Sequence, residues 1–253
     1  MESVVEICRK VLKRLSEMDY ERIGGSSMER LIFPVKIQAN GTKEKDRISE
    51  QELRQLFIEE FKIMHKDLYY SIETPTKNKY SFSNEKNEKK VGDIDNKGQS
   101  ALVDMCVFDK VKETYKRTFN IEFKHKNATH DNISKDILKL MHEEENGAFV
   151  LLLKNTDDGT FKSVFKKFSS SFDTHLFKEC WSKNDSFIEI IILSLEEKRS
   201  RNGVPFLIHR KIKCIDILKD IFSFDGSLSI IEQLKKNGWD VEPVEVKDIN
   251  KID

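Results

Sequence analysis

Two strand-like segments separated by a short polar turn region occupy the middle of the sequence, and their pattern limits the folds open to the chain. Residues 101–109 (ALVDMCVFD) form a nearly continuous apolar run, as in a buried strand. Residues 117–126 (RTFNIEFKHK) alternate apolar and polar positions, as in a strand with one buried face. Because the connection between them is short, we expect the two strands to pair as a hairpin.

A helix and a further strand are predicted directly after these two segments. Apolar residues recur at helical spacing over residues 131–144. Gly147 follows, and residues 148–153 (AFVLLL) are apolar throughout, which suits a strand covered on both faces. The order strand, strand, helix, strand predicts an antiparallel pair and then a crossover to a parallel strand. The predicted fold class is therefore α/β, a mixed α+β sheet flanked by helices.

Further helices and strands are predicted around this centre. Residues 49–67 carry a helical apolar stripe, and Ser49 with Glu52 three residues later is a capping-box pattern. A strand over residues 69–74 is expected to end at Pro75. The other predictions are helices over residues 3–19, 161–181, 215–222 and 228–237, strands over residues 31–38, 187–195 and 206–213, and loops over residues 42–46 and 78–100.

The length of 253 residues fits one large domain or one domain with appendages. We divide it into an N-terminal extension of one helix and one strand (1–47), a core (48–155) and a C-terminal α/β part that completes or extends the same domain (156–253). No apolar run is long enough to cross a bilayer, and the charged, helical start is unlike a signal peptide. The four cysteines are far apart, with no C-x-x-C pair, which indicates reduced thiols and a cytoplasmic protein.

Three charged residues lie within the two central strand segments. Asp104 is in the first, and Glu122 and Lys124 are in the second. Residues two apart on a strand point to the same face, so Glu122 and Lys124 project together while Ile121 and Phe123 point the other way. Two carboxylates can hold a hard cation, and an ammonium can position a water or stabilise charge on a phosphate. This set suits metal-assisted cleavage of a phosphodiester bond. The alternative is a pair of ordinary exposed charges, against which the apolar surroundings of Asp104 argue.

A fourth acid lies on the apolar side of the helix predicted over residues 49–67. Glu60 is i+7 from Leu53 and i+3 from Phe57, near the middle of the stripe. Burying an unpaired carboxylate costs on the order of several kcal/mol, so Glu60 needs a partner such as a bound cation or a water on one. The alternative is that Glu60 pairs with a buried Lys or Arg, or sits at the edge of the stripe.

At these residues the chain resembles the PD-(D/E)XK nuclease superfamily, whose pattern is an Asp on one strand and Glu-x-Lys on the next. Here the pattern reads Asp104 and then Glu122-Phe123-Lys124, and Val103 stands where the family has a proline. The resemblance covers roughly residues 48–155. It implies a restriction-endonuclease-like core.

The resemblance also implies a role for each of these residues. Asp104 and Glu122 would ligate one or two magnesium ions, for which manganese could substitute, and the backbone carbonyl of Phe123 would add an oxygen. Glu60 would match the acid that a helix before the core sheet often supplies in this family, and would orient metal-bound water or a second ion. Lys124 would lie by the nucleophile.

The predicted function is that of a magnesium-dependent nuclease acting on nucleic acid, with DNA favoured over RNA. Lys+Arg and Asp+Glu balance at 44 each, which fits local phosphate contacts better than tight holding of a long duplex. Residues 198–213 contain six basic residues and no acid, which suits a phosphate-contacting face or an ordinary exposed hairpin. A homodimer would suit double-strand cutting, since that usually requires two sites. The alternative prediction is a non-catalytic module of the same fold that binds nucleic acid or protein in a larger assembly.

Other site patterns are missing from the sequence. The six histidines show no H-E-x-x-H spacing, which argues against zinc chemistry. Neither G-x-x-x-x-G-K-[ST] nor G-x-G-x-x-G occurs, and there is no G-x-S-x-G elbow. Lys126, Asn127, His130 and Lys135 follow the motif and are weaker candidates for phosphate contacts.

Overall fold

The computed structural model describes residues 4–21, 29–37, 44–82, 93–126, 128–154, 157–174, 181–183, 185–196, 204–216, 218–224 and 228–245. The helices in these ranges are α1 (Val4–Glu17), α2 (Glu50–Met64), α3 (His130–His142), α4 (Asp158–Thr174), α5 (Leu218–Phe222) and α6 (Ile230–Lys236). The strands are β1 (Val35–Ile37), β2 (Glu44–Asp46), β3 (Leu68–Ser81), β4 (Asp93–Ile94), β5 (Gln99–Val111), β6 (Thr114–His125), β7 (Asn146–Leu153), β8 (Phe187–Ser194), β9 (Phe206–Lys213) and β10 (Asp240–Pro243).

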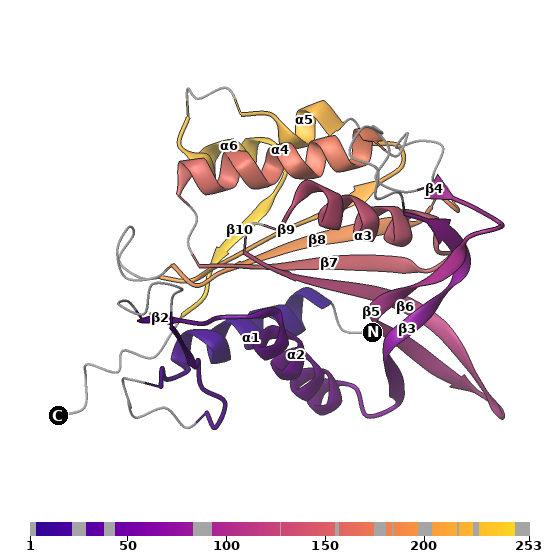
Figure 1. The fold of residues 1–253 in the computed structure, drawn as a ribbon. Helices are drawn as coiled ribbons and strands as arrows, with labels where there is room; N and C mark the ends of the chain where they lie inside the picture. Colours follow the sequence, from indigo (N-terminus) through magenta and orange to yellow (C-terminus); the bar gives the residue numbers. More distant parts are fainter. Residues whose placement is uncertain are drawn as a thin grey trace.

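One mixed sheet organises the described residues. Its eight strands run in the order β10-β9-β8-β7-β6-β5-β3-β4 (Figure 1). β6, β7 and β8 are parallel to one another, and the other neighbours are antiparallel. The α/β class with a mixed, helix-flanked sheet is therefore confirmed, as are the β5–β6 hairpin and the crossover through α3 to a parallel strand. The apolar run predicted as a doubly covered strand is β7, which is buried from its second residue onward.

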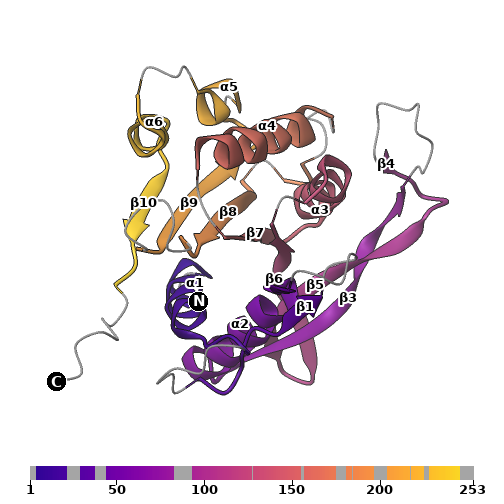
Figure 2. The ribbon, with the colours of Figure 1, turned by 60° about the vertical axis from the view of Figure 1, so that its left-hand side comes forward.

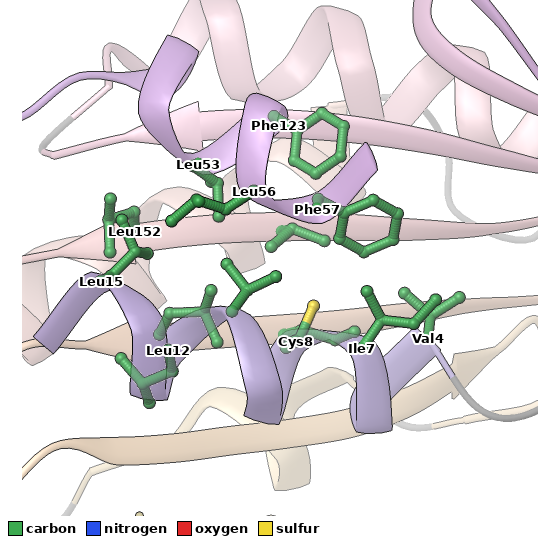
Figure 3. Packing of buried hydrophobic residues seen from close by; sticks show 14 of the residues in the cluster. Val4, Ile7, Cys8, Leu12, Leu15, Leu53, Leu56, Phe57, Phe123 and Leu152 are labelled. Atoms are coloured by element: carbon green, nitrogen blue, oxygen red, sulfur yellow. The ribbon is translucent and has the colours of Figure 1, made fainter. Parts of the chain in front are cut away.

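Helices cover both faces of this sheet (Figures 1 and 2). α1 and α2 pack on one face over a core that includes Leu12, Phe57 and Phe123 (Figure 3). The rings of Phe57 and Phe123 meet edge to face at 5.1 Å. α3, α4, α5 and α6 cover the other face, where Phe165 and Phe168 belong to a second buried cluster. Since β6 alternates its side chains, Phe123 faces α2 while its neighbours in the Glu-x-Lys motif face α3.

The two later parts of the chain share this sheet, whereas β1 and β2 of the N-terminal part pair with each other in a sheet of two strands. β7 comes from the predicted core, and β8, β9 and β10 come from the C-terminal part. α1, from the N-terminal extension, lies against α2 and against β8 and β9. The segments 1–47 and 156–253 therefore contribute to the layers that surround the central hairpin.

Several predicted boundaries are corrected by the structure. β3 continues through Pro75, which lies opposite Leu102 of β5. Within the described residues β4 pairs with β3 only at Tyr80 and Ser81, so at Pro75 a missing N–H can face an open side without loss of a ladder bond. The predicted loop over residues 42–46 contains β2, and β10 was not predicted. The segment 78–100 holds strand at both ends, and its residues 83–92 lie outside the described residues.

Candidate active site

The candidate site begins where β5 separates from β6. Their pairing runs from Val111 opposite Thr114 to Met105 opposite Ile121 and goes no further. At the next position the Asp104 carboxylate Oδ2 accepts a hydrogen bond from the backbone N–H of Phe123 at 2.7 Å. A side-chain carboxylate thus replaces the ladder bond at the point where the strands part.

The two polar residues of the Glu-x-Lys motif meet α3 on the same face of the sheet. The Glu122 side chain is 1% exposed, and its Oε1 lies 2.5 Å from Lys139 Nζ. Lys139 Nζ also lies 2.8 Å from Asp136 Oδ1 and donates a hydrogen bond to the Leu102 carbonyl at 2.7 Å. Glu122 is therefore bound to α3 through an ion pair, and Lys139 also ties α3 to the separated half of β5.

Lys124 forms the second half of this network. Its Nζ lies 2.8 Å from Asp136 Oδ2 and donates a hydrogen bond to the Phe123 carbonyl at 3.0 Å. The Asp136 carboxylate therefore bridges Lys124 and Lys139, one on each oxygen. The Lys124 side chain is 17% exposed, so its ammonium lies at the boundary between the buried network and solvent.

The N-terminal turns of α2 approach the same place. The helix begins after Ser49, whose side chain and that of Glu52 form the predicted capping box. Arg54 Nη1 lies 2.8 Å from Glu73 Oε1 and 4.0 Å from Asp104 Oδ1. Burial raises the pKa of Glu50, and the charges of Lys124, Asp104 and Asp136 also act on it, which places Glu50 in the electrostatic neighbourhood of the network. The site cluster, as used below, consists of Glu50, Arg54, Asp104, Glu122, Lys124, Asp136 and Lys139.

Burial and nearby charges shift the pKa values of Glu122, Lys124 and Lys139. Burial and the nearby Asp136 raise the pKa of Glu122 well above its ordinary range, although Lys139 opposes the shift. Burial alone would lower the pKa of each lysine, but the carboxylates outweigh it and both pKa values are raised. Lys124 therefore remains an ammonium at neutral pH, where it can stabilise negative charge but cannot accept a proton.

The structure does not bring Glu60 to the site cluster. Its Oε1 lies 3.0 Å from Arg14 Nη1, and Arg14 also contacts Glu59 and Glu29. Glu60 follows Glu50 by ten residues on α2, which is about 15 Å along a helix. The structure thus shows the alternative expected for Glu60, an ion pair with an arginine, and places this acid away from Asp104 and Glu122. The helical stripe was read correctly as buried, but at this point α2 faces α1, whose arginine neutralises the acid.

Four members of the site cluster were given no role in the sequence analysis: Glu50, Arg54, Asp136 and Lys139. Asp136 and Lys139 are one turn apart on the buried side of α3, with 6% of each residue exposed. The signal was available, since Asp136 follows the apolar Ile133 by three residues and precedes Leu140 by four. Glu50 offered only its position in the first turn of a capped helix, which is common for an acid.

The weaker candidates are distributed around the entry to α3. His130 Nδ1 lies 3.3 Å from Asp131 Oδ1, and Lys135 Nζ lies 5.3 Å from the ring centroid of Phe82. Lys126 follows β6 with a positive φ of 61°. Asn127 lies outside the described residues, as do the first six residues of the basic segment 198–213, whose remainder includes β9.

The oxygen groups of the site cluster have the chemistry of ligands for a hard divalent cation. Asp104, Glu122 and the Phe123 carbonyl supply the oxygen donors that magnesium prefers, and a cation beside Glu122 would oppose the burial and the Asp136 charge that raise its pKa. In this structure, however, the Glu122 and Asp136 carboxylates form ion pairs with lysines. Within the described part of the chain, no three His, Cys, Asp or Glu side chains are grouped so that they could hold a metal ion.

Comparison with protein-family models, with curated proteins and with solved structures finds no match to this chain. A search of the described helices for a membrane span finds none that is long and apolar enough. The chemistry of the site cluster is therefore the basis on which a function can be argued.

Proposed function

We propose that this chain is a metal-dependent nuclease of the PD-(D/E)XK type that hydrolyses phosphodiester bonds in DNA. The observation that carries the proposal is the junction of Asp104, Glu122 and Lys124 where β5 separates from β6. Asp104 caps the backbone N–H of Phe123, so both carboxylates and the ammonium are held at the same break in the sheet. A fold that needed only stability would gain little from this, because buried ionic groups rarely stabilise better than apolar ones.

The order of elements around the site supports a restriction-endonuclease-like core. α2 precedes the antiparallel strands β3, β5 and β6, and α3 then leads to β7, which is parallel to β6. This is the order that the resemblance implies for residues 48–155. Glu50 at the start of α2, rather than Glu60, lies where a helix before the core sheet would supply an acid.

Each residue has a definite part in the proposed reaction. Asp104, Glu122 and the Phe123 carbonyl would hold magnesium, or manganese in its place. The ion, when bound, would polarise a phosphoryl oxygen and favour ionisation of water. Lys124 supplies a fixed positive charge for the phosphate in the transition state. Asp136 orients that ammonium through a 2.8 Å contact.

The proposed setting is the cytoplasm, with DNA as the substrate and a homodimer as the form that cuts both strands. Cys8, Cys106 and Cys214 are free thiols in the described residues, which suits a reducing compartment. Magnesium-mediated contacts suit a chain with no net charge, because such a nuclease relies less on a large basic surface.

Cleavage assays test the proposal directly. Linear, circular, single-stranded and duplex DNA would be incubated with magnesium or manganese, and in parallel with EDTA. We expect metal-dependent cutting that falls by more than about 100-fold in Lys124→Ala, as on loss of a group that stabilises transition-state charge. Lys10→Ala, at an exposed position of α1 outside the site cluster, should retain activity. Cutting that persists in EDTA, or in folded Lys124→Ala, would refute the proposal.

A non-catalytic module of the same fold is the second candidate, and one observation favours it. The lysines already neutralise Glu122 and Asp136, so the site cluster is stable without an ion. This reading predicts no cutting of any DNA form and no binding of magnesium or manganese at millimolar concentration. Nucleic-acid or protein binding without cleavage by the folded protein would favour it.

A further inference from the structure

Lys139 is held as a bound cation would be held. Its ammonium lies within 2.8 Å of oxygens from three different residues: Glu122 Oε1 at 2.5 Å, Asp136 Oδ1 at 2.8 Å and the Leu102 carbonyl at 2.7 Å. These residues belong to β6, α3 and β5. Two carboxylates and a carbonyl from separate elements form the kind of oxygen set that binds a hard cation.

We propose that Lys139 fills a cation position of the site, which a divalent ion would occupy if the ammonium were removed. This inference rests on the proposed nuclease function, since it concerns the same metal site. In the wild-type chain Asp104 and the Phe123 carbonyl remain for one divalent ion, with Glu122 shared between that ion and Lys139. The site would then work with one metal ion and one built-in ammonium.

The burial of Lys139 distinguishes it from an ordinary surface lysine. Lysine is almost never buried without a partner, and only 6% of this residue is exposed. Lys135, one turn earlier on α3, is partly exposed and lies by the ring of Phe82 instead. The two lysines therefore form a natural pair for experiment, one inside the oxygen set and one outside it.

The site cluster contains more acidic than basic groups, which favours the exchange of an ammonium for a divalent ion. Its four carboxylates (Glu50, Asp104, Glu122 and Asp136) face three cationic groups (Arg54, Lys124 and Lys139). Removing the Lys139 ammonium leaves Glu122 and the Leu102 carbonyl without a cation in a buried place, where unpaired charge is costly, and it leaves Asp136 with Lys124 alone. A divalent ion restores the balance, whereas a neutral side chain of similar length such as methionine does not.

Counting bound ions tests this inference without any cleavage assay. Manganese would be titrated into the wild type, Lys139→Met and Lys135→Met, and free ion measured by electron paramagnetic resonance. We expect Lys139→Met to bind one more ion per chain than the wild type and Lys135→Met to match the wild type. Lys139→Arg, which keeps the charge, should also match it. No additional ion in Lys139→Met, or an additional ion in Lys139→Arg, would overturn the inference.

Thermal unfolding gives a second measure and guards against a variant that does not fold. In EDTA, Lys139→Met should unfold at a lower temperature than the wild type, and manganese should recover most of that loss. A variant that is unfolded in EDTA but folds with manganese supports the inference equally. A variant that fails to fold in either condition counts against it, because an ion that replaces the ammonium should restore the site.

The wild-type ion count and the difference between variants answer separate questions. A wild type that binds no ion and cuts no DNA contradicts the proposed function. The additional ion in Lys139→Met can still be present in that case, and would show that the ammonium occupies a cation position in a protein that is not a nuclease.

Discussion

Two clusters of this protein combine carboxylates and cationic side chains in different ways. The first is the site cluster, where β5 leaves β6. The second is the Arg14 cluster, which we define as Arg14 with Glu29, Glu59 and Glu60. Arg14 donates from Nε to Glu29 at 2.8 Å, from Nη1 to Glu60 at 3.0 Å and from Nη2 to Glu59 at 2.6 Å. A single guanidinium thus serves three carboxylates and joins α1 to α2.

The difference between the clusters lies in the cation and in the backbone. A guanidinium is a rigid fork that satisfies several carboxylates at once, which suits a permanent joint between helices. In the site cluster Glu122 and Asp136 are held by lysines, whose compact ammonium groups sit on flexible stems, and Arg54 is only 4.0 Å from Asp104. The main-chain N–H and carbonyl of Phe123 also take part. The three carboxylates of the Arg14 cluster share one guanidinium as their cation, whereas Glu122 and Asp136 are divided between two ammonium groups. Proximity of acids alone therefore does not indicate a reactive site.

The largest expected contrast between the clusters is in catalysis. Glu122→Gln should lower DNA cleavage by more than about 100-fold, because loss of even an outer partner of a metal ligand costs 10–100-fold. Glu60→Gln, which removes the same charge from the Arg14 cluster, should leave the rate per folded molecule unchanged. Initial cleavage rates at saturating magnesium give the comparison, and a strong loss in Glu60→Gln would return that residue to the site.

A smaller effect is expected for Asp136, which acts through the two lysines. Asp136→Asn should lower kcat by about 10- to 100-fold, the range for residues that orient a functional group. KM should change less than kcat, because Asp136 is buried and would act by holding Lys124. Asp131→Asn, at the exposed start of α3, is the matched control. Equal changes in kcat and KM would show a general loss of structure instead of misplacement of Lys124.

The Arg14 cluster should respond in stability and not in activity. Arg14→Met leaves three carboxylates without their cation, and we expect a loss of about 1–3 kcal/mol, between the values for exposed and buried pairs. Lys10→Met, at an exposed position of the same helix, should change the free energy of unfolding much less. Urea unfolding measures the free energy of unfolding of both variants. Equal stability of the two would show that the ion pairs of Arg14 contribute nothing to the stability of the fold.

The smallest effects concern pH, and they have opposite signs at the two ends of α2. Burial raises the pKa of Glu50 above 4.5 in the folded protein. Ionised Glu50 therefore lowers the stability as the pH rises above the pKa of the unfolded chain, and the loss is complete above the pKa of the folded protein. A hydrogen bond from Gln55, with help from Arg14, lowers the pKa of Glu59. Glu59 thus contributes stability above pH 4.5 that is lost as the pH falls through its folded pKa.

Glu50→Gln should therefore raise the melting temperature at pH 7, and Glu59→Gln should lower it. Both differences should shrink as the pH falls toward and below 4.5, since the acids are then protonated in the unfolded chain as well. Melting curves of the wild type and the two variants between pH 3 and pH 7 give the comparison. The same sign for both variants at pH 7 would contradict the distinction between the two clusters.

The sequence predicted the elements of the site better than the partners within it. Strand alternation placed Glu122 and Lys124 on one face, and the apolar surroundings of Asp104 marked it as an unusual acid. The stripe of α2 could not distinguish Glu60 from Glu50, because a periodic pattern shows that a side is covered but not whether a sheet or another helix covers it. The neighbour of Glu60 is an arginine 46 positions earlier in the chain, a contact that no local pattern contains.

The separation of β5 from β6 at Asp104 was also beyond a reading of local pattern. β5 is a continuous strand in sequence terms, and its separation from β6 depends on the carboxylate that caps Phe123 and on the lysine of α3 that bonds to Leu102. The prediction that a strand ends at Pro75 was wrong, because a strand with one open side tolerates proline. Elements set by periodicity were therefore predictable, and those set by long-range polar contacts were not.

The parallel pairing of β7 with β8 has a consequence for how the chain can be divided. Both strands are buried from the second residue to the last, so each depends on the other to cover its hydrogen-bonding edge. A fragment ending after Leu153 would contain every member of the site cluster and yet expose an uninterrupted hydrophobic edge. Such edges pair with one another and favour aggregation. The part of the chain that holds the site cluster should therefore aggregate when it is separated from the part that supplies β8.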